Sequence, residues 1–168
     1  PNSFQASFLT IPQGQQQAPF RPARRTKKPV VHGSKTAVVV GPAGEEIFVD
    51  KYGRVKVQFH WDREGRRDAT SSCWLRVGTS IAGNKWGTMF IPRVGQEVIV
   101  DFMEGDPDQP IIVGSVYNAE RMPHYDLPKF KTMTYIKTRT SPDDGKGFNE
   151  LRFEDKAGEL PFGADPVL

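Results

Sequence analysis

The feature that most constrains this sequence is the shortness of its apolar runs, nearly all of which end at a glycine or a proline. The 168 residues include 14 prolines and 16 glycines, which interrupt helices and central strands. This punctuation favours many short strands joined by turns over long amphipathic helices. A chain of this length has room for about one ordinary domain with attached segments. We therefore predict a mainly β protein with one hydrophobic core.

The clearest strand is predicted over residues 53–61, where apolar and polar side chains alternate. A period of two is typical of a strand that buries one face. The pattern predicts that Val55, Val57, Phe59 and Trp61 face the core and that the polar residues between them face solvent.

Further strands are predicted at intervals along the chain, and each ends near a glycine or a proline. Cys73, Leu75 and Val77 are expected to share the buried face of one of them. Five or six short strands at this spacing suit a small closed or partly closed barrel, such as the five-stranded OB-fold. The predicted ranges are 37–40, 73–78, 86–91, 96–103 and 111–117, with a tight acidic turn at 105–110.

Two of these strands, 96–103 and 111–117, carry large apolar groups on both faces. One face fits the core, and a second apolar face is what burial between subunits requires. The residues expected opposite the core are Ile99, Met103, Ile111 and Val113. They predict contacts between copies of the chain.

The segments outside the barrel lack this regular texture. Residues 119–147 are expected to be a connector that is partly ordered by Tyr125, Leu127 and Phe130 packing onto the barrel. The alternation of Leu151 and Phe153 with charged neighbours predicts a new strand after it. The predicted organisation is a connector over 1–35, a barrel over 36–118, a connector over 119–147, a β-element over 148–160 and a divergent or truncated tail over 161–168.

Charge and cysteine content exclude several classes of protein. The formal net charge is only +3, and its excess lies in one proline-rich cluster that we interpret as a solvated linker rather than a nucleic-acid surface. The single cysteine, Cys73, excludes an intrachain disulfide and a cysteine-based zinc site. The cluster consists of Arg21, Arg24, Arg25, Lys27 and Lys28.

Targeting signals are also missing from the sequence as given. No run approaches the roughly 18 to 20 continuous apolar residues of a membrane span, and the start does not resemble a signal peptide. We expect any export to proceed without a standard signal. Because the chain begins at Pro1 rather than methionine, we expect it to be part of a longer protein.

The candidates for chemistry are few, and each has a structural interpretation that fits better. His32, His60 and His124 lie in no recognisable catalytic motif, and a solvent-facing role is expected for His60. Cys73 is interpreted as a buried small hydrophobe. The remaining candidates are the carboxylates Glu104, Asp106 and Asp108, which suit a tight turn better than a calcium loop, and the glycines 41, 44 and 53, which do not form a phosphate loop. We predict no catalytic, cofactor-binding or metal-binding residue and no cofactor.

An OB-like barrel with several aromatic residues also raises the possibility of single-stranded nucleic acid, which stacks on such side chains in a basic groove. Core packing is the favoured interpretation, because two of the aromatics share a face with valines and the basic residues are interleaved with acidic ones. The residues concerned are Phe59, Trp61, Trp74 and Trp86.

Four ordered blocks of sequence resemble the VgrG spike proteins of bacterial type VI secretion systems. They are GEEIFVDKYGRVKVQFHWDREG (44–65), SSCWLRV (71–77), PRVGQEVIVDFMEGDPDQPIIVGSVYN (92–118) and GFNELRFEDKAGE (147–159). The resemblance implies a homotrimer with an N-terminal hub, an OB-fold barrel and a triple-stranded β-helical needle. Residues 1–35 would connect from the hub, and 148–160 would begin the needle. The two prolines within 161–166 depart from the needle pattern.

The resemblance also implies a function and a set of partners. Such a spike caps the inner tube, carries effectors or a needle-tip protein, and punctures a target membrane. It would be assembled in the bacterial cytoplasm and then secreted or injected into target cells. It is related to contractile phage tail spikes and is not an enzyme, and it binds no nucleic acid. Two alternatives stay open: a phage-like baseplate spike with a cell-wall lysin elsewhere in the chain, and an OB-fold binder of single-stranded nucleic acid.

Overall fold

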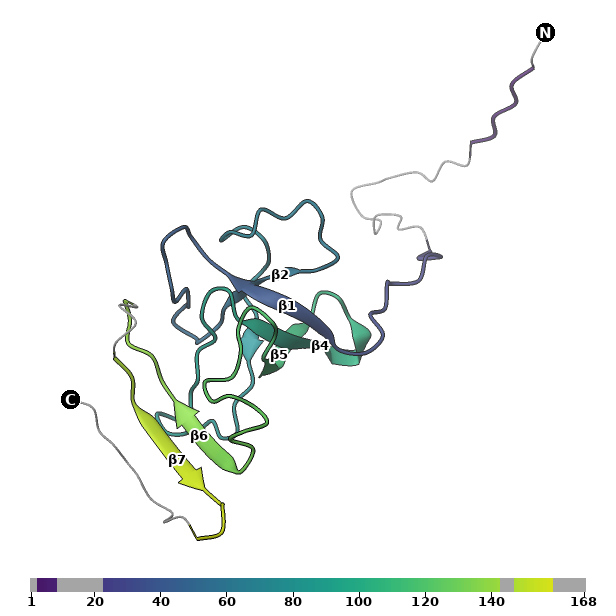
Figure 1. Ribbon diagram of the computed structural model, residues 1–168. Coiled ribbons are helices and arrows are strands. Elements are labelled where there is room, and N and C mark those ends of the chain that lie inside the picture. Colours follow the sequence, from purple (N-terminus) through teal and green to yellow (C-terminus); the bar gives the residue numbers. More distant parts are fainter. Residues whose placement is uncertain (1–2, 9–22, 143–146, 159–168) are drawn as a thin grey trace.

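The computed structural model describes residues 3–8, 23–142 and 147–158, and these contain seven strands and one short 3-10 turn (Figure 1). The predicted tail over 161–168 lies outside the described residues. No helix in the described ranges is long and apolar enough to cross a membrane. The elements are β1 (Lys35–Val40), β2 (Lys56–Phe59), β3 (Arg76–Val77), β4 (Glu97–Phe102), η1 (Met103–Gly105), β5 (Pro110–Val116), β6 (Met133–Lys137) and β7 (Glu150–Glu154).

Five strands form one curled sheet in the order β2-β1-β4-β5-β3. Neighbours are antiparallel except β3 and β5, which run parallel. A bridge between Val55 and Leu75 then joins the two ends of the sheet, because Val55 precedes β2 and Leu75 precedes β3. The sheet therefore bends round on itself, and the predicted mainly β, OB-type barrel is confirmed.

The core is built by the alternation that the sequence shows. Val98, Val100 and Phe102 of β4 point inward, while the residues between them do not. Each fully buried side chain of this size contributes roughly 1.5 to 3 kcal/mol, so the barrel has a core of its own. The other members of this buried cluster are Ala37, Val39, Val55, Val57, Leu75 and Ile112.

In the strand predicted over 53–61, the alternation of buried and exposed side chains ends earlier than predicted. Val55 and Val57 are fully buried, but Trp61 is 52% exposed and stacks on the ring of Phe59 at 4.3 Å between centroids. Gln58, expected in solvent, is only 5% exposed. The reason is that the chain turns back after β2, so that the Gln58 amide is covered and donates to the Asp62 carbonyl at 3.1 Å.

The expected strand over 73–78 is shorter, and the prediction of a buried Cys73 is wrong. Cys73 is exposed, and regular pairing begins only at Leu75. The cause is the preceding serine: the Ser72 hydroxyl accepts the backbone N–H of Val57 at 3.0 Å. A side chain thus occupies the position at which a strand carbonyl would pair.

The predicted strand over 86–91 is a loop. Hydroxyl groups hold its base, since the Thr79 hydroxyl donates to the Thr88 carbonyl at 2.6 Å. Trp86, Met89 and Phe90 are 65% to 68% exposed, so the apolar run that suggested a strand lies on the surface instead.

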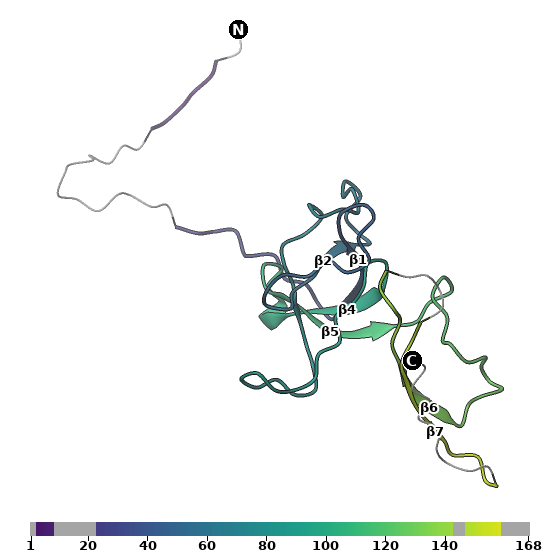
Figure 2. The same ribbon diagram turned by 90° about the vertical axis from the view of Figure 1, so that its left-hand side faces the viewer.

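The connector predicted over 119–147 contains a strand, β6, which pairs antiparallel with β7. The expected lone strand therefore has a partner in its own chain. The sequence of β6, MTYIK, shows no clear apolar alternation, so the period of two does not predict this strand. This hairpin lies beyond the β4–β5 side of the barrel (Figure 2).

Candidate functional site

The β6–β7 hairpin has two faces of opposite character. Its register pairs Ile136 with Leu151 and Thr134 with Phe153, so these four side chains share one face. Ile136, Leu151 and Phe153 are 50%, 44% and 39% exposed. The opposite face is half-buried and mostly polar or charged, and it carries Met133, Tyr135, Lys137, Glu150, Arg152 and Glu154.

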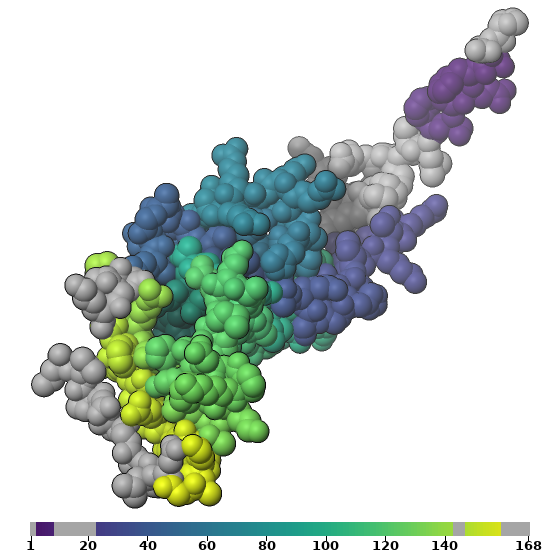
Figure 3. Space-filling view, viewed as in Figure 1, coloured from purple at the N-terminus to yellow at the C-terminus, as the bar shows by residue number. Residues whose placement is uncertain are grey.

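The charged face is covered by the connector that precedes β6. Tyr125 contacts the Tyr135 ring edge-on at 5.1 Å and donates its hydroxyl to the Glu150 carboxylate. The Thr132 hydroxyl donates to Glu154 at 2.5 Å. Figure 3 shows the green connector lying against the yellow hairpin strand. The prediction that this connector packs onto the barrel through Tyr125, Leu127 and Phe130 is therefore wrong: Phe130 packs on Tyr125, and Leu127 is exposed.

The polar side chains on this face form a hydrogen-bonded network around the Glu150 carboxylate. Burial raises the pKa of the Glu150 carboxyl, but hydrogen bonds from Tyr125 and Lys137 outweigh it and hold that pKa below the ordinary 4.5. Burial, and then the bond to Glu150, raises the pKa of Tyr125. Lys137 lies 3.2 Å from Glu150 and 2.7 Å from the His124 ring nitrogen. The hairpin thus turns its charges toward its own chain and its apolar side chains outward.

A second apolar surface lies on the outside of β4, η1 and β5. Met103 is 46% and Val113 is 53% exposed, while Ile99 and Ile111 are half-buried. None of the four belongs to the core cluster, so the expectation that they lie opposite the core is confirmed. Val116 and Tyr117 extend this exposed surface along the end of β5.

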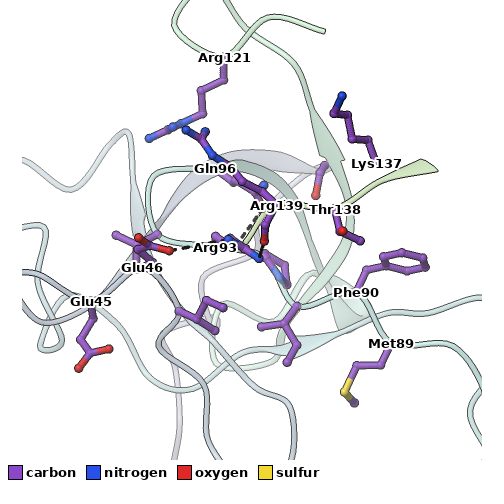
Figure 4. Close-up of a pocket in the computed structure, with 15 residues that line it drawn as sticks. Glu45, Glu46, Met89, Phe90, Arg93, Gln96, Arg121, Lys137, Thr138 and Arg139 are labelled. Carbon is purple, nitrogen blue, oxygen red and sulfur yellow. Dashed lines mark hydrogen bonds and ion pairs between the residues drawn. The ribbon is translucent and has the colours of Figure 1, made fainter. Parts of the chain in front are cut away.

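Between barrel and hairpin lies a cavity of 680 Å³ (Figure 4). Arg93, in the turn before β4, lies 3.8 Å from Glu46 and donates to the Arg139 carbonyl at 2.5 Å. Arg121 donates to the carbonyl of Gly95. Because these cations bind groups of the chain itself, the cavity forms the joint between the barrel and the hairpin. Its lining includes Glu45, Glu46, Met89, Phe90, Arg93, Gln96, Ser115, Arg121, Lys137, Thr138 and Arg139.

Comparison with known proteins places the barrel in a family. Residues 37–117 match the type VI secretion system/phage-baseplate injector OB domain. The chain belongs to the VgrG spike family. It is 58% identical over 140 residues to the type VI secretion system spike protein VgrG4b of Pseudomonas aeruginosa, and 57% identical over 140 residues to VgrG1a of the same organism.

These matches cover 83% of this chain but only 17% and 22% of the two relatives. A third relative, the actin cross-linking toxin VgrG1 of Vibrio cholerae serotype O1, is 54% identical over 132 residues, which are 79% of this chain and 12% of that protein. The chain therefore spans about a fifth or less of the length of the curated VgrG relatives it matches.

Within this VgrG segment, the residues weighed for chemistry are scattered. His60 is exposed at the barrel surface, with its ring 3.7 Å from Glu97. His124 lies on the hairpin network, and His32 lies on the exposed upstream connector. In the parts of the chain that the structure describes, no group of three or more His, Cys, Asp or Glu side chains could hold a metal ion.

The upstream connector contacts the acidic turn of the VgrG barrel. Lys28 approaches Asp106 at 2.6 Å and Asp108 at 3.4 Å. The backbone N–H of Val31 donates to the Gly105 carbonyl at 2.8 Å. Sequence reasoning interpreted the carboxylates as a turn, but missed this docking because Lys28 is 78 residues from Asp106. The basic cluster of the connector could have suggested it.

The aromatic residues of the barrel are used in contacts with other side chains. Phe59, Trp61 and Phe102 contact one another, and Trp74 packs on Phe48 at 4.9 Å. Trp86 is 68% exposed. The expectation of core packing thus holds for Phe59 in part and fails for Trp61 and Trp86, whose rings lie at the surface.

Proposed function

We propose that this chain is the barrel and the needle base of a trimeric type VI secretion spike. The observation that carries the proposal is the inverted hairpin, with its charged face covered by its own chain and Ile136, Leu151 and Phe153 exposed. A hairpin that acted alone would bury its apolar face and solvate its charges. Two further copies of the chain, wound round a common axis, are the occupants that would cover this apolar face.

A three-fold assembly would also account for two other features of the fold. An isolated two-stranded hairpin is marginally stable in water, and its outer edges leave backbone groups unpaired. Strands from neighbouring copies would pair those edges and bury the apolar side chains together. The exposed surface at Met103 and Val113 would bring the barrels into contact in the same assembly.

In this proposal the spike caps the inner tube, is driven through a target membrane, and carries effectors or a needle-tip protein. It is assembled in the bacterial cytoplasm and leaves through the secretion apparatus. The support is the kinship with the spike proteins of Pseudomonas aeruginosa. The Vibrio relative, named as an actin cross-linking toxin, supports attachment of an effector outside the shared segment. The chain itself acts mechanically, without catalysis or cofactor.

One alternative has a specific observation in its favour. The injector family covers phage baseplates as well as type VI systems, so a phage-like spike with a cell-wall lysin elsewhere would carry the same barrel. An assay of cell-wall hydrolysis on the complete protein separates the two. The other alternative, an OB-fold binder of single strands, requires salt-dependent binding to single-stranded nucleic acid.

The proposal is tested by the mass of the complete protein in light scattering at micromolar concentration. We expect a trimer, and a Phe153→Asp variant that dissociates, because three copies of that side chain would bring unpaired charges into an apolar interface. Met122→Asp is the matched control, since Met122 is also exposed but lies outside the hairpin.

A stable monomer of the unaltered protein would overturn the proposal. So would a Phe153→Asp variant that stays as trimeric as Met122→Asp while both retain the folded barrel.

A further inference from the structure

Arg93 lies where the barrel and the hairpin meet, and its backbone is held firmly on the barrel side. Its N–H donates to the Gln96 side chain at 2.9 Å, and its carbonyl accepts from the Gln96 N–H at 3.0 Å. In the same turn, the Val94 N–H donates to the Glu46 carbonyl at 2.9 Å, and the Gly95 N–H donates to Val39 of β1 at 2.7 Å. The turn that carries Arg93 is thus fixed to β1, which pairs with a strand on each side.

The side chain of Arg93 reaches across the joint from this fixed base. One guanidinium nitrogen lies 3.8 Å from the Glu46 carboxylate, and the other donates to the Arg139 carbonyl at 2.5 Å. The side chain is 28% exposed. Arg139 follows the Thr138–Asn149 pairing that extends the β6–β7 hairpin, where the Thr138 N–H donates to the Asn149 carbonyl at 2.8 Å. The guanidinium therefore links the hairpin to Glu46 of the barrel, and the Arg93 backbone fixes it to the 93–96 turn.

Resting on the proposed spike function, we propose that Arg93 is a positioning residue that sets the direction of the needle base relative to the barrel. A planar guanidinium presents several donors in a fixed geometry, so one of its nitrogens can donate to the Arg139 carbonyl while another faces the Glu46 carboxylate as an ion pair. A lysine ammonium is a point charge on a flexible stem and cannot reproduce this fork. In a spike loaded along its axis, a fixed joint passes force from barrel to needle without bending.

The residue acts through orientation, so the test must measure orientation. Spin labels on the native, exposed Cys73 of the barrel and on an introduced Thr134→Cys of the hairpin report the distance across the joint. Labelled complete protein is diluted with unlabelled protein, so that most assemblies carry one labelled copy. We expect one narrow distance distribution with Arg93 present.

In Arg93→Ala that single narrow distribution should be lost, with no change in the unfolding midpoint of the barrel. Arg93→Lys, which keeps the charge but not the planar set of donors, should give a distance distribution of intermediate width. If the alanine variant does not fold, the lysine variant is used for the test. Arg63→Ala, an exposed arginine in a barrel loop, is the control with the same loss of charge and should keep the narrow distribution.

The inference would be overturned if Arg93→Ala gave a distance distribution as narrow as that of the unaltered protein. If Arg93→Ala does not fold, the same result in Arg93→Lys would overturn it. A broadening equal to that of Arg63→Ala would overturn it as well. The two proposals can fail separately. If the unsubstituted protein is a monomer and Arg93→Ala still gives a broad distance distribution, the role of Arg93 at the joint is supported and the trimeric spike is refuted.

Discussion

Leu75 shows how closure of the barrel depends on a single residue. Its side chain is fully buried, and its backbone exchanges two hydrogen bonds with Val55, at 2.8 and 3.0 Å. These bonds join the end strands of the curled sheet. The same residue thus supplies core volume and lies at the position where the sheet closes.

Leu75→Ala is expected to lower the free energy of unfolding by about 2 to 5 kcal/mol, because it removes buried methyl groups and leaves a cavity. Leu127→Ala is the matched control: Leu127 is 62% exposed, and its loss should change stability by less than about 0.5 kcal/mol. Urea unfolding of the 168-residue chain measures both. Equal losses in the two variants would contradict the described core.

Asp106 is the residue whose charge holds the upstream connector to the barrel. The hydrogen bond from Lys28, followed by bonds from the Asp108 N–H and the Gln109 amide, holds the pKa of this carboxyl at about 2, below the ordinary 3.8. A pKa that is lower in the folded than in the unfolded state means that folding favours the carboxylate. This contribution is present above the unfolded value and is lost as the pH falls through the folded one.

The stability advantage of the wild-type chain over Asp106→Asn should therefore shrink as the pH falls from about 4 to about 2. Thermal unfolding at a series of pH values gives this difference directly. Asp126→Asn, an exposed aspartate in another segment, controls for general acid effects. A wild-type advantage that stays constant over this range would show that the Lys28 contact does not contribute in solution.

At the scale of elements, the barrel strands and the hairpin differ in how much of their surroundings the chain itself supplies. β1 and β4 are central strands that pair on both sides and enclose the core. Among the described residues, β6 and β7 pair only with each other, and their apolar face is exposed. The barrel can therefore fold on its own core, whereas the hairpin depends on what covers it.

Hydrogen exchange should reflect this difference. In a monomeric 168-residue chain, the amides of β6 and β7 are expected to exchange faster than those of β1 and β4, because local opening exposes little apolar surface. In the complete assembled protein, protection of residues 133–137 and 150–154 should rise. Protection of the monomeric hairpin equal to that of β4 would mean that it is stable without other copies, and the needle-base interpretation would have to be abandoned.

At the scale of the whole molecule, the proposed work is mechanical, so isolated reactive side chains should be dispensable. His60 and Cys73 are both exposed, and surface substitutions away from special contacts usually change stability by about 0.5 kcal/mol or less. Replacing either with alanine should leave secretion of the complete protein intact. Loss of secretion in His60→Ala, at unchanged protein level and oligomer mass, would reveal a functional site at the barrel surface.

The barrel could be predicted from local sequence because its determinants are local. Alternation places Val98, Val100 and Phe102 on one face, and the Gly- and Pro-rich turns limit strand length. The exposed outer face at Met103 and Val113 follows from the same period of two. The family could also be recognised at this level, because four blocks of sequence with natural spacing carry it.

Three features could not be predicted in this way: the joint at Arg93, the covering of the charged hairpin face by the connector, and the outward apolar face of the hairpin. Arg93 and Arg139 are 46 residues apart, and Tyr125 and Glu150 are 25 apart, so no periodicity links them. Cys73 is exposed because the Ser72 side chain takes the position at which a strand would pair. Gln58 is buried because the chain turns back over it after β2. Neither outcome follows from the polarity of the residue itself. Alternation shows that a strand has two different faces. Which face the chain itself covers depends on where distant segments pack, and that is settled only when the chain is folded.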